Sequence, residues 1–174
     1  MTWDNQAFAA VFNELYPGMC RFLECMMGRS GSAHDIAQET FMRLLRKGSG
    51  MPAEEVRFWS YRVARNLALN ELQKTATRSR LGEDLRTHLN TGVTTPEQEY
   101  EQVERNNVLT ELLTLLPEPQ RAALVLREQQ EMSYSQIARV LNVSESKVKV
   151  DIHRARLRLR AEWNQLHEPR AAIK

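Results

Sequence analysis

Residues 133–160 carry the pattern that most constrains the fold, because three local signals define two helices and the turn between them. The segment S-Y-S-Q at 133–136 places glutamine three residues after serine, the spacing of a capping box at a helix start. Asn142 tolerates the left-handed backbone of a tight turn, and Ser144 can cap the next helix. The apolar side of the first helix consists of Ile137, Ala138 and Leu141. We predict a helix-turn-helix within about 25 residues.

The second of these helices has the features of a DNA recognition helix. Six basic residues and one acid, Asp151, lie between Lys147 and Arg160. A helix in the major groove needs donors on its outer face and apolar anchors on its inner face. The expected anchors are Val148, Ile152, Ala155 and Leu159. The candidate DNA-binding residues on the outer face are Glu145, Ser146, Lys147, Lys149, Val150, His153, Arg154 and Arg156. We expect the early ones at base edges and the later arginines at phosphates; the alternative is a solvated basic helix.

The first half of the chain predicts three more helices. Apolar residues from Phe8 to Met26 recur at spacings of three and four, and Pro17 should kink or break that helix. Ser32 is a candidate N-cap for a second helix, with inward side chains expected at Ile36, Ala37, Phe41, Leu44 and Leu45. After a loop at 47–52, a third helix is expected to run to about Lys74, with Val56, Trp59, Val63 and Leu67 on its apolar face.

The predicted fold is all-α, with two small helical domains and a tether. Between Thr75 and Glu101 the apolar pattern thins, and glycine, proline and four glutamates at 97, 99, 101 and 104 follow one another closely. We predict a first helical domain at 1–74, a flexible acidic linker at 75–104 and a helix-turn-helix domain at 105–174. No segment requires a strand.

The third predicted helix interleaves aromatic and basic residues. Rings and guanidinium planes stack on exposed bases while positive charge follows the backbone, so this mixture suits single-stranded DNA. The candidates are Trp59, Tyr61, Arg62, Arg65, Asn66 and Asn70. Trp59 also falls on the apolar stripe and could equally belong to the core. The four polar candidates lie on a face that this stripe leaves free.

Several other classes of function find no support in the sequence. The chain has no glycine-rich phosphate loop, no G-x-S-x-G and no H-E-x-x-H, so we expect no enzyme. Cys20 and Cys25 lack the usual C-x2-C pairing, and we expect free core thiols without a metal or cofactor. No apolar run approaches the ~18 residues of a membrane span, and the first residues do not resemble a secretory signal. We therefore expect a cytoplasmic location without membrane insertion.

Three segments together resemble a bacterial extracytoplasmic-function (ECF) sigma factor of the sigma-70 superfamily. They are A-H-D-I-A-Q-E-T-F-M-R-L-L-R at 33–46, W-S-Y-R-V-A-R-N-L-A-L-N at 59–70 and V-K-V-D-I-H-R-A-R-L-R-L-R at 148–160. The resemblance spans residues 4–166. It implies a dissociable specificity subunit of RNA polymerase that directs promoter recognition, DNA melting and transcription initiation in a stress response.

The resemblance also implies particular contacts. Asp35, Gln38, Glu39 and Arg43 should dock on the coiled coil of the polymerase beta-prime subunit. The 47–53 loop and the helix after it should hold the opened minus-ten element, while the second domain reads the minus-thirty-five element and touches the beta flap. An anti-sigma factor is the expected inhibitory partner. Asp151, on the recognition helix, would either repel phosphate or accept from a cytosine amine, depending on its orientation.

Two rival functions make different predictions. A stand-alone helix-turn-helix transcriptional regulator should bind a palindromic site tightly without help. An interaction protein whose basic helix binds acidic partners should show no preference for a DNA sequence. A sigma factor should bind weakly alone and direct promoter-specific transcription once core polymerase is added.

Overall fold

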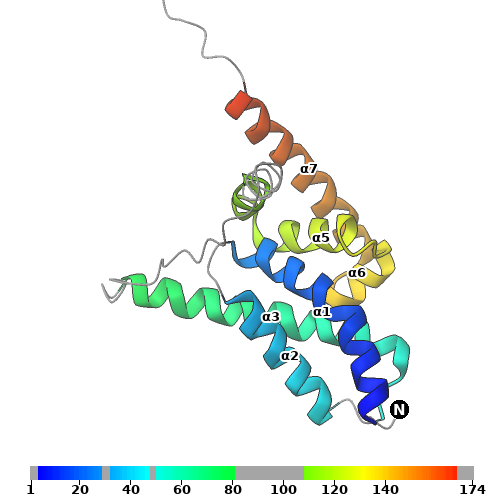
Figure 1. The fold of residues 1–174 in the computed structure, drawn as a ribbon. Helices are drawn as coiled ribbons and strands as arrows, with labels where there is room; N and C mark the ends of the chain where they lie inside the picture. The colour runs from blue at the N-terminus through cyan, green and yellow to red at the C-terminus, as the bar shows by residue number, and fades with distance from the viewer. Residues whose placement is uncertain (1–3, 29–31, 48–49, 81–107, 168–174) are drawn as a thin grey trace, which may run out of the picture.

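The computed structural model describes residues 4–28, 32–47, 50–80 and 108–167 (Figure 1). Within these ranges helices are joined by short turns and there is no strand, so the all-α prediction is confirmed. The first lobe contains α1 (Asn5–Met27), α2 (Ala33–Lys47) and α3 (Ala53–Arg80). The second contains a helical segment at 108–114, α5 (Glu118–Glu128), α6 (Tyr134–Leu141) and α7 (Glu145–His167).

Helix α1 continues through Pro17, so the proline does not break it. The Asp4 side chain caps its start by accepting a hydrogen bond from the Ala7 amide at 2.6 Å. Proline removes one backbone donor from the helix ladder. Buried residues on both sides of it, including Leu15, Met19 and Phe22, hold the two halves in one helix against the core.

Helices α2 and α3 begin where they are expected, but they differ from the prediction in which side chains they bury. Leu45 is 46% exposed rather than inward. Along α3, the predicted face is only partly buried beyond Val56, while a second stripe at Phe58, Tyr61, Ala64 and Ala68 is buried. The reason is that α3 packs against the first lobe and also against α6 of the second. A helix covered on two sides does not show a single apolar stripe.

The helix-turn-helix forms as predicted. The Ser133 side chain accepts from the Gln136 amide while the Gln136 side chain accepts from the Ser133 amide, completing the capping box. Asn142 ends α6 in the left-handed conformation with φ 56°. The Ser144 hydroxyl then accepts from the Lys147 amide at 3.2 Å at the start of α7. Each of these caps joins residues that are close together in the chain, which is why the sequence alone predicts them.

The two lobes pack against each other rather than standing apart (Figure 1). One continuous hydrophobic cluster contains Met19 and Leu23 of the first lobe together with Leu126 and Met132 of the second. Helix α1 contacts α5, and α3 contacts α6. This packing was not expected from the sequence.

The predicted linker lies mostly outside the described residues. Residues 75–80, expected in it, instead continue α3 to Arg80. Residues 81–104 are not among those that the structure describes, and neither are residues 48 and 49 of the 47–53 loop.

Candidate nucleic-acid interface

The outer face of α7 is open to solvent along its N-terminal half. The exposed residues are Glu145, Ser146, Lys147, Lys149, Val150, His153, Arg154 and Arg156, all the positions expected to face outward. Val148, Ile152 and Ala155 are buried beneath them, and Leu159 is half-buried. The helix therefore presents a mainly polar and basic surface on a fixed apolar base, the arrangement required for insertion into the major groove.

Asp151 does not belong to that surface. It is 2% exposed and its carboxylate forms an ion pair with the Lys147 ammonium group, one turn earlier. Because Asp151 faces the lobe's interior, neither contact considered for it, with phosphate or with a cytosine amine, is available in this structure. Its pairing leaves Lys147 with its charge partly compensated at the edge of the α7 face.

Tyr134 is a neighbour of the α7 face that sequence reasoning missed. The Arg127 guanidinium lies 5.0 Å from the centroid of its ring and the Lys149 ammonium lies 5.7 Å from it. Such cation–π contacts restrict long basic side chains at little cost in desolvation. The ring therefore holds two cations next to the recognition helix. The signal was present in the capping segment S-Y-S-Q, where only the cap was considered.

The six candidates on α3 fall into different environments. Asn66 and Asn70 are exposed, and Arg62 is exposed apart from one contact. Trp59 is half-buried and packs against the hydrophobic core, as its place on the apolar stripe allowed. Tyr61 is 1% exposed and is among the most buried side chains. In this arrangement Tyr61 is not available to a base.

Tyr61 is held by the second lobe. Its hydroxyl donates to Gln130 Oε1 at 2.5 Å, and its ring packs edge-on against Phe22 with centroids 5.4 Å apart. Burial is the largest cause that raises the pKa of Tyr61 to about 12. The phenol therefore remains a neutral donor at any physiological pH.

Arg62 and Arg65 also contact the second lobe. Arg62 Nη2 donates to the Arg139 carbonyl at 2.6 Å, near the C-terminal end of α6. Arg65 forms a two-pronged ion pair with the Glu118 carboxylate at 2.6 and 2.7 Å, with both side chains about one-fifth exposed. Three of the six α3 candidates, Tyr61, Arg62 and Arg65, thus form hydrogen bonds or an ion pair with the second lobe.

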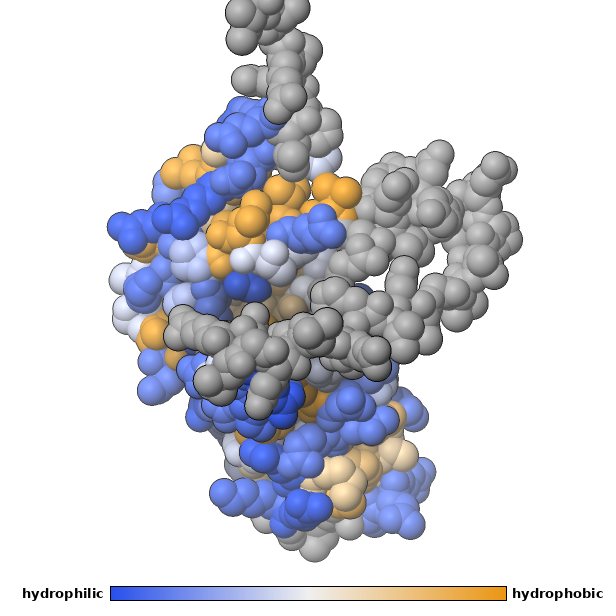
Figure 2. All heavy atoms as spheres, turned by 90° about the vertical axis from the view of Figure 1, so that its left-hand side faces the viewer, coloured by the Kyte–Doolittle hydropathy of each residue, from blue (hydrophilic) through white to orange (hydrophobic). Residues whose placement is uncertain are grey.

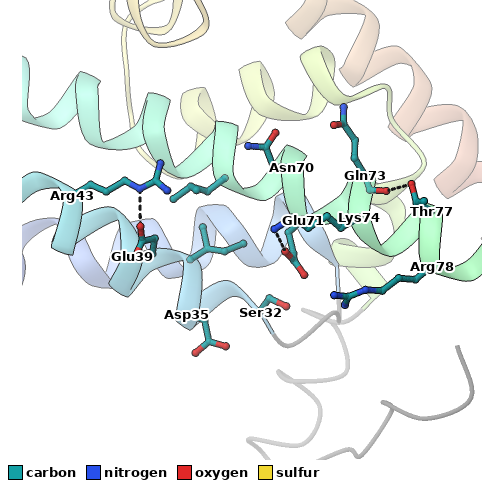
Figure 3. Close-up of a pocket in the computed structure, with 12 residues that line it drawn as sticks. Ser32, Asp35, Glu39, Arg43, Asn70, Glu71, Gln73, Lys74, Thr77 and Arg78 are labelled. Carbon is teal, nitrogen blue, oxygen red and sulfur yellow. Dashed lines mark hydrogen bonds and ion pairs between the residues drawn. The ribbon is translucent and has the colours of Figure 1, made fainter. Parts of the chain in front are cut away.

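Three of the four residues expected to dock on polymerase line one groove of about 910 Å³ between α2 and the C-terminal half of α3 (Figure 3). Asp35, Glu39 and Arg43 line it from α2, and Asn70, Glu71 and Lys74 line it from α3. Arg43 Nε pairs with Glu39 at 2.7 Å. Gln38 is exposed outside the groove. The exposed residues Met42 and Leu45 on the same helix add apolar surface suited to a protein partner.

A second groove, of about 450 Å³, is apolar and lies wholly in the second lobe. Leu109, Leu113, Val125 and Leu159 contribute to its walls, with Glu128 and Arg156 at its polar part. Figure 2 shows hydrophobic surface gathered on this lobe between hydrophilic stretches.

Both cysteines are buried free thiols. Burial is the largest cause that raises the pKa of Cys20 and of Cys25, which keeps them protonated and unreactive. Among the described residues no group of side chains has the composition of a metal site. In that same part of the chain, no helix has the length and apolar character needed to cross a bilayer.

The fold and these surfaces define a two-lobed helical protein with an exposed basic helix in its helix-turn-helix and a separate groove between α2 and α3. Comparison with known families assigns residues 11–78 to sigma-70 region 2 and residues 106–159 to sigma-70 region 4. The chain is 32% identical to the ECF RNA polymerase sigma factor SigM of Bacillus subtilis, over 92% of this chain and 95% of SigM. It is 27% identical to SigW of the same organism, over 94% and 92% of the two chains.

Two solved structures share the fold. One is the sigma factor RpoE of Bartonella quintana in complex with the anti-sigma factor NepR, with a TM-score of 0.70, 18% identity and coverage of 91% of this chain and 98% of RpoE. The other is CnrH in complex with the cytosolic domain of CnrY, with a TM-score of 0.68, 19% identity and coverage of 93% and 90%.

The chain belongs to the ECF sigma factors of the sigma-70 superfamily, as the sequence resemblance predicted. The family match does not favour the stand-alone regulator.

Proposed function

We propose that this chain binds core RNA polymerase and directs it to promoters, with a separate task for each of three helices. Helix α2 docks on the beta-prime coiled coil through Asp35, Gln38, Glu39 and Arg43. Helix α3 holds the opened strand of the minus-ten element. Helix α7 reads the minus-thirty-five element as duplex.

The observation that carries this proposal is the outer face of α7. The eight positions predicted to face outward between Glu145 and Arg156 are all exposed, on a helix anchored by Val148, Ile152 and Ala155. A helix of this kind placed in a major groove brings its first turns to base edges and its later arginines to phosphate. The exposed side chains of Asn66 and Asn70 supply the corresponding open surface on α3.

Binding to both promoter elements requires the lobes to separate. Elements centred about 25 base pairs apart lie ~85 Å apart on straight duplex, at about 3.4 Å per base pair. Lobes that share one hydrophobic cluster cannot span that distance. The chain between Arg80 and Val108 has a contour length of at most about 95 Å, which is long enough to connect them. Once both lobes are mounted on polymerase, the second contact becomes intramolecular and avidity rises.

Inhibition by an anti-sigma factor belongs to the same proposal. In the two solved structures that share this fold, RpoE is in complex with the anti-sigma factor NepR and CnrH is in complex with the cytosolic domain of CnrY. A partner that binds across the packed lobes of this chain would keep them together and unavailable to a promoter. The family also supports a cytoplasmic location.

The direct test is run-off transcription with purified core polymerase and the full chain over a library of genomic fragments. We expect transcripts from a small set of promoters only when both are present. The matched control is core polymerase alone. Tight binding of the isolated chain to a palindrome, with no transcripts on adding polymerase, would support the stand-alone regulator instead.

A further inference from the structure

Val150 is an apolar side chain within the polar outer face of α7. It is 42% exposed and is not among the side chains that pack against the hydrophobic core. The residues three and four positions away on either side are all polar: Ser146, Lys147, His153 and Arg154. Valine is also a poorer helix former than alanine or lysine, because its branched side chain loses χ1 freedom in a helix. Neither packing nor helix stability therefore accounts for a valine at this position.

The helical period fixes the direction in which Val150 points. At about 100° per residue, the buried anchors Val148, Ile152 and Ala155 lie on one side of α7, and Val150 points about 170° away from their mean direction. None of the other seven candidate positions on the outer face points so directly away from the anchors. When this face enters a major groove, the side chain opposite the anchors reaches deepest. Val150 therefore meets base edges.

The position of Val150 along α7 also places it among the base-reading residues. Helix α7 begins at Glu145, so Val150 lies in its second turn. Leu157 points in the same direction two turns later and is 56% exposed. The early residues of a recognition helix contact base edges, whereas its later residues meet the phosphate backbone, which offers no apolar group. Of the two, Val150 is the apolar side chain that can contact a base.

One base alone presents an apolar group in the major groove. Guanine, cytosine and adenine expose only donors and acceptors there, whereas thymine adds a methyl group at C5. Valine has no hydrogen-bonding group in its side chain, so a base donor or acceptor pressed against it would lose its water without replacement. Contact with a thymine methyl group instead removes apolar surface of both partners from water.

We propose that Val150 is a specificity-determining residue that selects thymine, through its C5 methyl group, at one position of the minus-thirty-five element. Either strand can supply this thymine. Ser146 and His153 lie about 6 and 4.5 Å from Val150 along the helix axis, so they face the base pairs on its two sides. The inference rests on the proposed function, because it names the base chemistry that the outer face of α7 reads.

The test uses holoenzyme assembled from the full chain and core polymerase, on a promoter identified by run-off transcription. Each thymine of the minus-thirty-five element, on either strand, is replaced in turn by deoxyuridine, which keeps base pairing and removes only the methyl group. Affinity for each promoter is measured by fluorescence anisotropy with the wild-type chain and with Val150→Ser. The matched control is Val143→Ser, because Val143 is 40% exposed and lies in the turn before α7.

One deoxyuridine substitution should weaken wild-type binding about fourfold, the factor that corresponds to one methyl group withdrawn from water. Val150→Ser should bind the unmodified promoter more weakly and should not respond to that substitution. Its binding to core polymerase should equal that of the wild-type chain. Val143→Ser should respond to the deoxyuridine as the wild-type chain does.

Several results would overturn the inference. One is wild-type binding that no deoxyuridine substitution weakens, and another is an equal loss in the wild-type chain and in Val150→Ser. A minus-thirty-five element without any A·T pair would also exclude a thymine contact. A response to deoxyuridine that disappears in Leu157→Ser but persists in Val150→Ser would assign the contact to Leu157 instead.

Failure of the proposed function would look different. If alanine at both Lys149 and Arg154 leaves promoter-specific transcription unchanged, α7 does not read the minus-thirty-five element. If that double variant loses transcription while deoxyuridine has no effect at any position, the function stands and Val150 does not read thymine.

Discussion

Replacing Tyr61 by phenylalanine measures what the buried hydrogen bond between the lobes contributes to stability. The substitution removes one oxygen from a side chain that is 1% exposed and leaves its ring against Phe22. Gln130 Oε1 then loses the hydroxyl donor that lies 2.5 Å from it. Because Gln130 is only 8% exposed, this oxygen is left as a buried acceptor without that donor. An unsatisfied buried acceptor costs about 1–3 kcal/mol. For a chain of this size we therefore expect the melting temperature to fall by about 2–12 °C.

A double-mutant cycle with Gln130→Met separates this bond from other effects of the two substitutions. Each single variant leaves a polar partner unpaired, whereas the double variant removes both groups. Urea unfolding followed by circular dichroism should give a double variant less destabilised than the sum of the singles by about 0.5–3 kcal/mol. Additive effects would refute the reasoning, because they would mean that the two side chains do not interact in solution.

The remaining predictions concern pH, DNA, polymerase and helix capping. The pKa of Tyr61 is about 12 in the folded protein and 10.0 for an ordinary tyrosine, so the unfolded chain loses this proton at lower pH than the folded one. The free energy of unfolding should therefore be unaffected below pH 10 and fall by about 2–3 kcal/mol between pH 10 and 12. Alkaline denaturation of Tyr61→Phe should lack this loss. Alanine at both Lys149 and Arg154 should abolish transcription from the cognate promoter in run-off assays while core binding in a pull-down stays intact. Asp35→Lys should weaken retention by core polymerase in the same pull-down, and normal retention would remove Asp35 from the docking face. Ser133→Ala should cost about 1 kcal/mol in thermal unfolding, the typical value of an N-cap, and no loss would argue against the capping box.

The features that could be predicted from the sequence depend on neighbouring residues. The helix-turn-helix could be predicted from the sequence because Ser133, Gln136 and Asn142 cap or end a helix within one or two turns of their own position. The inner and outer faces of α7 followed from its 3.6-residue period for the same reason. The position of Asp151 did not follow from this period, because a carboxylate is not expected on the buried face. Its ion pair with Lys147 accounts for its burial.

The contacts between the lobes could not be predicted in this way. Arg65 lies on the face of α3 that the apolar stripe left free, and Tyr61 is one of the aromatic residues interleaved with basic ones, which made both candidates for DNA. Their partners, Gln130 and Glu118, are more than fifty residues away in the chain. Only the folded arrangement reveals that the second lobe covers this face. Leu45 was misplaced for a related reason, since an exposed leucine on α2 follows the same helical period as a buried one.

The absence of a side chain at position 18 has a consequence for the contact between the lobes. A Cβ atom there would lie 2.6 Å from the amide oxygen of Gln130, so a larger residue at this site requires the Gln130 side chain to move away from Gly18 and Tyr61.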